Sequence, residues 1–289
     1  DVLSEMKGVA KDQVFLGNGS DEGIDLLIRI FCEPGIENIV SMDPTYGMYK
    51  VCADINAVEY KSVKLTSEFQ LDLERFDEVI DEHTKLLFLC SPNNPTGNSL
   101  NKKDIFTLLD KFPGPVVVDE AYVDFSKQKS LLSELNSYRN LVILQTFSKA
   151  WGLAGIRFGM VYAQKEIIDL LYKIKYPYNL NAVTQDLAFE FMSKSKEKDN
   201  WVAMILSEKQ RLEAAIEKFP MVVENYPTDA NFLMVKMADP QAILKFLKEK
   251  KIIVRDRSRV TLCEGCLRIT VGSKEENDAL LKALNEWNV

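Results

Sequence analysis

The sequence predicts an α/β fold, with a large domain whose mostly parallel sheet is sandwiched by helices and a smaller α+β domain after it. Up to about residue 198, apolar runs as long as buried strands alternate with amphipathic helical patterns, which is typical of parallel sheets. Beyond that point the strands are shorter and follow one long helical pattern. We therefore expect a large domain over residues 1–198 and a small C-terminal domain over residues 199–289.

The first strand and helix are predicted around "QVFLGNGSDEG", residues 13–23. Apolar residues at 24, 27, 28 and 31 follow with helical spacing. The amides of a first helical turn are free to bind a phosphate, so Ser20 and Asp21 are candidates for an anion site, while a plain helix cap by either side chain is the alternative. The glycines at 17, 19 and 23 miss the GxGxxG spacing by one residue, which argues against a nicotinamide cofactor.

Two further strands end in polar segments. The run "KLLFLC" (85–90) precedes the turn "SPNNPTGNS", and after the helical stretch "KKDIFTLLDKF" the strand in "GPVVVDEAY" ends at Asp119. In open α/β sheets, ligands bind at the carboxyl ends of the parallel strands. A carboxylate buried there is costly unless it meets a positive group. A protonated pyridine nitrogen is such a group.

A lysine lies between two predicted core strands in "TFSKAWGLAGIRFG", residues 146–159. Apolar runs flank it at 141–144 and 158–163. An isolated lysine in such a place is expected to be a solvated loop residue. Around Lys149, however, Thr146 and Ser148 supply hydroxyls, Arg157 supplies a guanidinium and three glycines allow close backbone approach. The segment predicts an anion site beside an amine that can form a Schiff base with a carbonyl.

The C-terminal part of the chain predicts the smaller domain. A long helical pattern runs from about 201 to 219, and the strands "ANFLMVK", "IIVRD" and "CLRITVG" follow it. Helices are predicted at "PQAILKFLKEK" and "ENDALLKALNEW". Short strands mixed with helices are typical of an α+β domain.

Composition excludes several classes of function. The 289 residues carry a net charge of −7 with no basic block, which argues against nucleic acid or an anionic membrane as partner. There is no apolar run of eighteen residues and no secretory leader, so we expect a cytoplasmic protein. The single histidine, His83, excludes serine and cysteine triads and multi-histidine metal centres. Cys263 and Cys266 form one CxxC without a second pair, so we expect neither a metal site nor a disulfide framework.

The motifs "SPNNPTG", "VVVDEAY" and "SKAWGLAGIRFG" occur in an order that resembles the fold-type I pyridoxal phosphate aminotransferases. Within that group, "FLGNGSDEGIDLLIRIFC", "DPTYGMYKVCA" and "VRDRSRVTLCEGCLRITVG" are similar to histidinol-phosphate aminotransferases. The resemblance extends over nearly the whole chain. It implies a homodimer that exchanges the amino group between L-histidinol phosphate and 2-oxoglutarate, forming L-glutamate, in L-histidine biosynthesis.

The resemblance also implies a role for particular residues. Lys149 holds pyridoxal phosphate as a Schiff base and later acts as acid and base, and Asp119 keeps the pyridine nitrogen protonated. The remaining expected residues bind the ring, the cofactor phosphate or the substrate anion. They are Asn94 and Tyr122 at the phenolic oxygen, Tyr46 on the ring face, Ser20, Asp21, Thr146, Ser148 and Arg157 at the phosphate, and Arg268 and Arg255 at the substrate, with Arg257 and Arg259 as alternatives to Arg255.

Members of the family begin with an N-terminal segment that wraps the small domain and contributes a tyrosine to the partner's cofactor phosphate. The sequence opens at Asp1 without that segment, so we expect its substrate pocket and full activity to depend on the missing part. Three alternatives to the expected function remain. A threonine-phosphate decarboxylase or an aromatic aminotransferase would keep the cofactor residues, and a non-catalytic effector-binding domain would require a basic DNA-binding domain that the acidic chain lacks.

Overall fold

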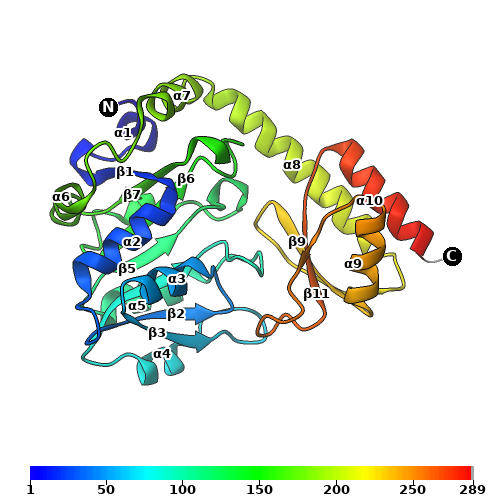
Figure 1. Ribbon diagram of the computed structural model, residues 1–289, viewed down its shortest axis with the longest axis horizontal. Helices are drawn as coiled ribbons and strands as arrows, with labels where there is room; N and C mark the ends of the chain where they lie inside the picture. Colours follow the sequence, from blue (N-terminus) through cyan, green and yellow to red (C-terminus); the bar gives the residue numbers. More distant parts are fainter. Residues whose placement is uncertain (288–289) are drawn as a thin grey trace.

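The computed structural model describes residues 1–287 and contains two sheets in two domains (Figure 1). The N-terminus lies on the large domain, and the last residues that the structure describes lie on the small one. The large sheet has seven strands in the order β1-β7-β6-β5-β4-β2-β3, and the small sheet has four in the order β10-β11-β9-β8. The predicted fold class is therefore confirmed.

The large sheet is parallel except at one strand. Its strands are β1 (Val14–Asn18), β2 (Asn38–Asp43), β3 (Glu59–Lys64), β4 (Thr84–Cys90), β5 (Val116–Asp119), β6 (Leu141–Thr146) and β7 (Phe158–Tyr162). Strands β2 to β6 pair in parallel, whereas β7 runs antiparallel to both β6 and β1. Side chains on both faces of β4 to β7 are almost entirely buried, as expected for strands covered on both sides.

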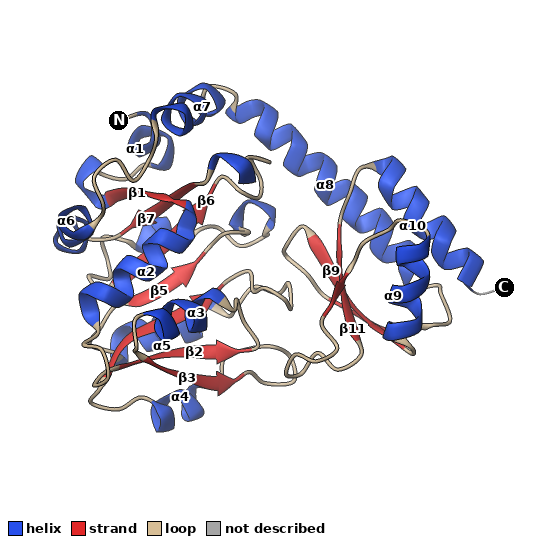
Figure 2. Cartoon of the chain, viewed as in Figure 1, coloured by secondary structure: helices blue, strands red, loops and turns tan. Residues whose placement is uncertain are grey.

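Helices cover the large sheet and occupy its connections (Figure 2). They are α1 (Val2–Lys7), α2 (Gly19–Phe31), α3 (Met48–Ile55), α4 (Leu73–Val79), α5 (Lys102–Lys111), α6 (Lys165–Ile174) and α7 (Ala182–Met192). Helix α2 packs across β6 and β7 through a stripe that includes Ile24, Leu27 and Ile28. Side-chain caps fix helix starts elsewhere, since Asp72 accepts from Arg75 N and Asn101 accepts from Lys103 N.

One long helix, α8 (Ser195–Ile216), carries the chain from the large domain to the small one (Figure 1). The predicted domain boundary at 198/199 falls inside it and stays a prediction. The helix begins six residues before the predicted start at 201, because its first turns, "SKEKDN", are polar and show no apolar periodicity. Sequence patterning detects a helix only where one face is buried.

The small domain packs α9 (Pro240–Glu249) and α10 (Lys274–Trp287) beside an antiparallel sheet. The strands are β8 (Val222–Tyr226), β9 (Phe232–Met237), β10 (Arg255–Asp256) and β11 (Cys266–Thr270). The predicted strand "IIVRD" is largely wrong, since only its last two residues pair with β11. Ile252 instead closes the end of α9, where its amide donates to the Leu247 carbonyl at 2.8 Å.

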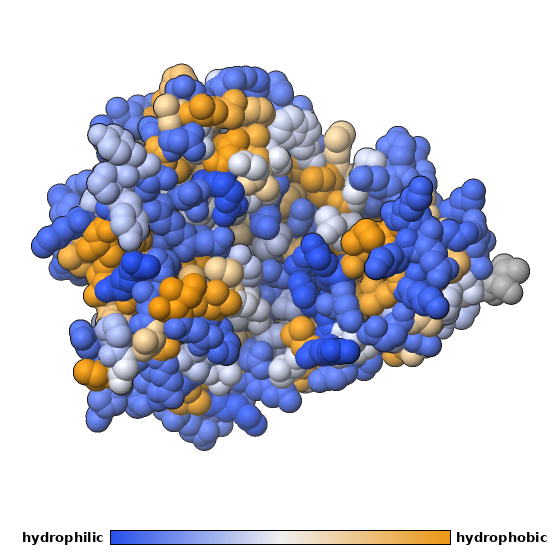
Figure 3. Space-filling view, viewed as in Figure 1, coloured by the Kyte–Doolittle hydropathy of each residue, from blue (hydrophilic) through white to orange (hydrophobic). Residues whose placement is uncertain are grey.

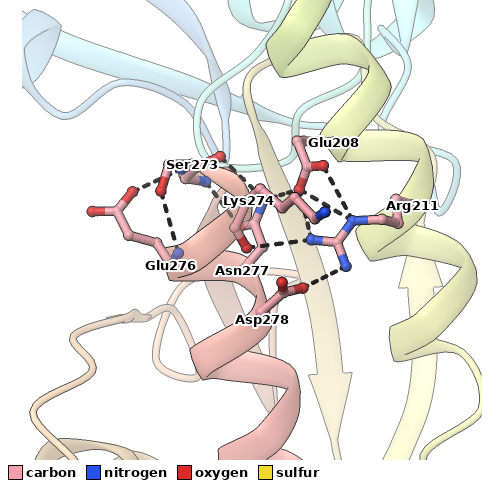
Figure 4. A network of polar contacts seen from close by, with 8 residues as sticks. Glu208, Arg211, Ser273, Lys274, Glu276, Asn277 and Asp278 are labelled. Carbon is pink, nitrogen blue, oxygen red and sulfur yellow. Dashed lines mark hydrogen bonds and ion pairs between the residues drawn. The ribbon is translucent and has the colours of Figure 1, made fainter.

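A polar network ties α8 to α10 (Figure 4). The Arg211 guanidinium contacts Glu208 at 2.7 Å and Asp278 at 2.7 Å, and Asn277 Nδ2 donates to the same Glu208 at 2.9 Å. Asn277 is itself buried, and its carbonyl oxygen accepts from Gly272 N. These bonds hold the end of β11, and hence the strand that carries Arg268, against the connecting helix.

Candidate active site

Ten of the twelve predicted site residues line one cleft at the carboxyl ends of the parallel strands. The cleft encloses about 580 Å³, part of it open to solvent. Its walls also include Cys90, Ala121 and Ala154, which sequence reasoning did not select. The predicted residues in it are Ser20, Asp21, Tyr46, Asn94, Asp119, Tyr122, Thr146, Ser148, Lys149 and Arg157.

Arg157 and the start of α2 form one end of the cleft. Arg157 has a left-handed backbone (φ 54°), and its carbonyl accepts from Gly19 N at 2.8 Å. Its Nη2 lies 3.3 Å from Asp21 Oδ2. Helix α2 begins at Gly19, whose amide bonds Arg157, and neither Ser20 nor Asp21 caps the helix, so the amides of Ser20 and Asp21 remain available to an anion.

Gly159 allows the strand β7 to touch that helix start. A Cβ on Gly159 would stand 2.1 Å from the Gly19 carbonyl carbon and 2.2 Å from Ser20 N. Only glycine permits such an approach. The glycine therefore serves the packing of α2 on β7, whereas Gly152 and Gly155 have open space at the Cβ position. Of the three glycines expected to allow close backbone approach, only Gly159 does so, and the backbone that it approaches is that of α2.

Two hydroxyls complete this end. Thr146 ends β6, and its Oγ1 lies 2.9 Å from Ser148 Oγ and accepts from Ser148 N at 3.1 Å. With the α2 amides and Arg157, these hydroxyls surround the end of the cleft with donors. That chemistry fits a phosphate monoester.

Lys149 stands in the turn between β6 and β7, on the wall of the cleft. Burial lowers the pKa of its ammonium group, and the nearby positive charge of Arg268 lowers it further. Its Nζ lies 5.3 Å from the centre of the Tyr122 ring. A lysine with a lowered pKa is more often neutral and nucleophilic, as Schiff-base formation requires.

Asp119 ends β5 at the floor of the cleft and is 3% exposed. Its Oδ2 accepts from Tyr49 Oη at 2.8 Å and its Oδ1 from Ala121 N at 3.0 Å. Burial raises the pKa of this carboxyl to about 6, against the lowering effect of those two bonds. A cation beside Asp119 would remove that cost, so the site fits a protonated pyridine nitrogen.

Tyr46 leans over the large-domain side of the cleft. Its hydroxyl donates to Asp21 Oδ1 at 3.1 Å, and its ring meets the Tyr49 ring edge to face at 5.7 Å. Burial, followed by the Asp21 charge, raises the pKa of the phenol well above its usual range. The ring is therefore held as a neutral apolar surface.

The two predicted substrate arginines lie outside the cleft walls proper, on the small domain. Arg268 on β11 reaches Asn94 of the large domain, with 2.5 Å between its Nη1 and Asn94 Oδ1. Its guanidinium carbon lies 4.9 Å from the centre of the Phe232 ring. Its Nε is buried without a hydrogen-bond partner in the described residues, which leaves one donor of the guanidinium available.

Arg255 pairs directly with Arg268 across β10 and β11, so the two side chains stand on the same face of the small sheet. Arg255 is exposed, whereas Arg257 is half-buried and its Nε is a second buried donor without a partner in the part of the chain that the structure describes. Both cations lower the pKa of Arg268, after the effect of burial. The sequence reasoning left the choice between these arginines open, and the geometry supports both as neighbours of Arg268.

Three residues at the site were missed by sequence reasoning. Tyr49 bonds Asp119, and Phe232 contacts both Tyr122 and Arg268. Thr228 Oγ1 lies 2.9 Å from the Phe232 carbonyl oxygen and 3.3 Å from that of Gly97. The Gly97 carbonyl also accepts from Asp229 N at 2.8 Å, so this segment joins the small domain to the loop that carries Asn94. Tyr49 and Phe232 lie in quoted segments, but nothing in those segments separates them from core aromatic residues. No local pattern marks Thr228.

The cysteines and the single histidine differ in their exposure to solvent. All five cysteines are buried free thiols, and burial is the main cause that raises the pKa of Cys263 to about 12. His83 is exposed beside Glu82. No group of three or more His, Cys, Asp or Glu side chains suited to a metal occurs among residues 1–287, and none of the helices described there is long and apolar enough to cross a membrane.

The comparisons with known proteins agree on one family. The model of the aminotransferase class I and II family matches residues 4–284. The histidinol-phosphate aminotransferase of Parabacteroides distasonis is 51% identical over 289 residues, which are 100% of this chain and 84% of that protein. That of Bacteroides fragilis strain YCH46 is 50% identical over 99% of this chain and 83% of its own length.

Solved structures share the fold at lower identity. The histidinol-phosphate aminotransferase from Clostridium acetobutylicum superposes with a TM-score of 0.89 at 23% identity, over 100% of this chain and 88% of that one. The L-threonine-O-3-phosphate decarboxylase from Porphyromonas gingivalis superposes with a TM-score of 0.84 at 21% identity, over 99% and 87%. The fold alone therefore does not separate these activities, whereas the sequence matches do. The chain belongs to the class I and II aminotransferases and, within them, to the family of the histidinol-phosphate aminotransferases.

Proposed function

We propose that this protein transfers the amino group of L-histidinol phosphate to 2-oxoglutarate, with pyridoxal phosphate as cofactor, in L-histidine biosynthesis. The single observation that carries the proposal is the meeting of Lys149, Asp119 and a donor-lined anion site in one cleft, within a chain half identical to proteins of that name. The solved histidinol-phosphate aminotransferase from Sinorhizobium meliloti, described in complex with pyridoxal-5'-phosphate, superposes with a TM-score of 0.89 at 21% identity.

Pyridoxal phosphate supplies an aldehyde that condenses with amines and a protonated ring that accepts the electron pair left when a proton leaves the substrate α-carbon. Lys149 Nζ would hold the cofactor through its aldehyde carbon and, when released, would move the proton at the substrate α-carbon. Its lowered pKa supports both tasks, because a neutral amine is nucleophilic and basic. Asp119 holds the proton on the pyridine nitrogen.

The other residues bind and orient. The amides at Ser20 and Asp21, with Thr146, Ser148 and Arg157, bind the cofactor phosphate. Tyr46 covers the ring face, and Tyr122 and Asn94 bond the phenolic oxygen. Asn94 Oδ1 already accepts from Arg268, which leaves its Nδ2 free to donate to that oxygen.

Arg268 and Arg255 bind the anionic end of each substrate in turn. The phosphate ester of histidinol phosphate and a carboxylate of glutamate both match the planar donor fork of a guanidinium. The contact of Arg268 with Asn94 supports an anion site beside the expected position of the cofactor's phenolic oxygen. Because both substrates use this one site, the first product must leave before the second substrate enters.

The activity is tested by absorbance spectroscopy of the cofactor-loaded protein. Addition of L-histidinol phosphate without a keto acid should convert the band of the lysine-bound cofactor into that of its amine form, and 2-oxoglutarate should restore it. An unchanged spectrum with this substrate would overturn the substrate assignment. Release of CO2 without any amino acceptor would identify a decarboxylase instead, and conversion by aromatic amino acids in preference to histidinol phosphate would identify an aromatic aminotransferase.

We also propose a cytoplasmic homodimer whose copies pack through the segment from α6 to α7. This segment exposes large apolar side chains, and Figure 3 shows apolar residues gathered over α7. Exposed patches of this kind mark interaction sites. The side chains concerned are Tyr172, Ile174, Tyr176, Tyr178, Val183 and Phe189.

The dimer is tested by light scattering after size exclusion. We expect twice the chain mass of 32.9 kDa for the wild type and a shift to single chains for Phe189→Lys. The change Met204→Lys on α8, at an equally exposed apolar residue, is the control that should remain dimeric. A monomeric wild type would overturn the proposed assembly.

A further inference from the structure

Tyr49 lies behind Asp119 and has no assigned role. It is fully buried on α3, and its hydroxyl donates to Asp119 Oδ2 at 2.8 Å. The other oxygen, Oδ1, accepts from Ala121 N at 3.0 Å, and a backbone amide can only donate. An ionised carboxylate can only accept, so donors on both oxygens match its charged form.

The ring of Tyr49 is held between two aromatic neighbours. It stacks on Phe88 of β4 with 5.0 Å between ring centres and 21° between planes, and it meets Tyr46 edge to face. Residues packed this way have one favoured orientation. The hydroxyl of Tyr49 is thereby fixed on Asp119, and the same ring supports Tyr46 at the face of the cleft.

The charged and titratable groups around Asp119 come from four elements. Tyr49 approaches from α3, Asp21 from α2, Cys90 from β4 and Lys149 from the turn after β6. Among the effects that lower the pKa of Asp119, the Tyr49 bond is the largest, ahead of the Ala121 amide and of Lys149. Tyr49 thus opposes most directly the tendency of burial to neutralise the carboxylate.

We propose that Tyr49 is a positioning residue for the cofactor, whose hydroxyl holds Asp119 ionised and aimed at the pyridine nitrogen. The inference rests on the proposed cofactor site. Its consequence is selective, because loss of the Tyr49 hydroxyl weakens only the part of cofactor binding that depends on a protonated ring nitrogen. Contacts to the phosphate and to the phenolic oxygen remain.

The test compares two ligands on cofactor-free protein. Dissociation constants are measured for pyridoxal phosphate and for its analogue with a carbon in place of the ring nitrogen, in wild type and in Tyr49→Phe. A hydrogen bond to a charged group corresponds to about a ten- to hundredfold change. We expect the constant for pyridoxal phosphate to rise by about tenfold or more at pH 8 and that for the analogue to stay unchanged. Equal weakening of both ligands, or no change, overturns the proposal.

The ratio of the two constants is then followed with pH. In wild type the preference for pyridoxal phosphate should decline as pH falls through about 6, where Asp119 becomes protonated. In Tyr49→Phe the decline should begin at higher pH, because the carboxyl has lost a bond that favours its charged form. An unchanged midpoint contradicts the proposed role.

Two further variants separate a specific role from a structural one. Tyr162→Phe removes another fully buried hydroxyl, one that has no hydrogen-bond partner in the described residues, and should change neither constant. In an Asp119→Asn background, Tyr49→Phe should have no additional effect on the ratio, since the group on which it acts is gone. An additional loss there would show that Tyr49 acts on something other than Asp119.

The outcome is separable from that of the proposed function. Normal discrimination between the two ligands without conversion of L-histidinol phosphate would overturn the substrate assignment and leave the role of Tyr49 standing. A wild type that binds both ligands equally would instead show that Asp119 does not pair with the ring nitrogen, and the role of Tyr49 would fall with it.

Discussion

The two anion-binding regions of the candidate site are built differently. The region proposed for the cofactor phosphate, with Arg157 and the start of α2, comes from adjacent elements of the large domain and is held by backbone contacts such as Gly19 to Arg157. The region for the substrate anion joins two domains through Arg268 and Asn94. If these roles hold, the cofactor phosphate rests on contacts within one domain, whereas substrate binding depends on how the two domains meet.

Lys149 is the residue proposed to act on both the cofactor and the substrate, so its loss should have the largest effect. In Lys149→Ala we expect the absorbance of the lysine-bound cofactor to disappear and transamination to fall by about a thousandfold or more, because both covalent attachment and proton transfer are removed. Stopped-flow and steady-state assays measure the loss. The exposed Lys103→Ala on α5 is the control and should retain wild-type rates. Retained turnover in Lys149→Ala would exclude the assigned role.

Replacing one arginine in each region should change substrate binding and cofactor binding separately. Arg268→Gln should lower kcat/KM for both substrates by about a hundredfold, through loss of charged hydrogen bonds, and leave the dissociation constant of the cofactor unchanged. Arg157→Gln should raise that dissociation constant by about tenfold and affect KM little. Equilibrium titration with the cofactor and steady-state kinetics of both variants test this difference. If both variants changed both quantities alike, the regions would not be independent.

The buried carboxyl of Asp119 affects the stability of the fold to an extent that depends on pH. Because the folded pKa of Asp119, about 6, lies above its value in an unfolded chain, its contribution favours folding at low pH and is lost as pH rises from about 4 through 6. Asp119→Asn should therefore raise the free energy of unfolding of the cofactor-free protein by up to about 3 kcal/mol at pH 8. Near pH 4 the difference should vanish.

Urea unfolding of the cofactor-free wild type and variant at several pH values measures this difference. With pyridoxal phosphate bound the order should reverse, because the ionised carboxylate then faces a cation. A difference in stability that does not vary with pH would mean that Asp119 titrates alike in the folded and unfolded states.

Loss of the Thr228 contact between the two domains should have the smallest effect on activity. Thr228→Val removes a hydroxyl that lies between the carbonyls of Phe232 and Gly97, whereas Asp229 N still donates to Gly97 at 2.8 Å, so the loop of Asn94 is loosened but stays attached to the small domain. We expect KM for both substrates to rise by about two- to tenfold, the range for one neutral hydrogen bond, with an unchanged cofactor constant. Thr107→Val on the exposed face of α5 is the control. A weaker cofactor in Thr228→Val would mean that the two regions are coupled.

Sequence patterns predicted the large domain better than the small one. Strands β4 to β7 were predicted because burial on both faces leaves continuous apolar runs such as "KLLFLC" and "GPVVVD". The polar start of α8 was not predicted, and the strand predicted at "IIVRD" pairs only over β10, because neither segment buries a continuous face. The same holds at the site, where residues at strand ends were predicted and Thr228, in a loop of the other domain, was not.

The sequence by itself determined the cofactor side of this protein. Lys149, Asp119 and Arg157 follow buried strands or lie between them, and strand ends at one sheet edge must converge, so their order along the chain fixes their meeting. Only the tertiary structure decided that Tyr49 bonds Asp119, that Gly159 touches Gly19, and that Arg268 reaches Asn94. These contacts join residues far apart in the chain, and their geometry depends on packing between elements, which no local pattern records.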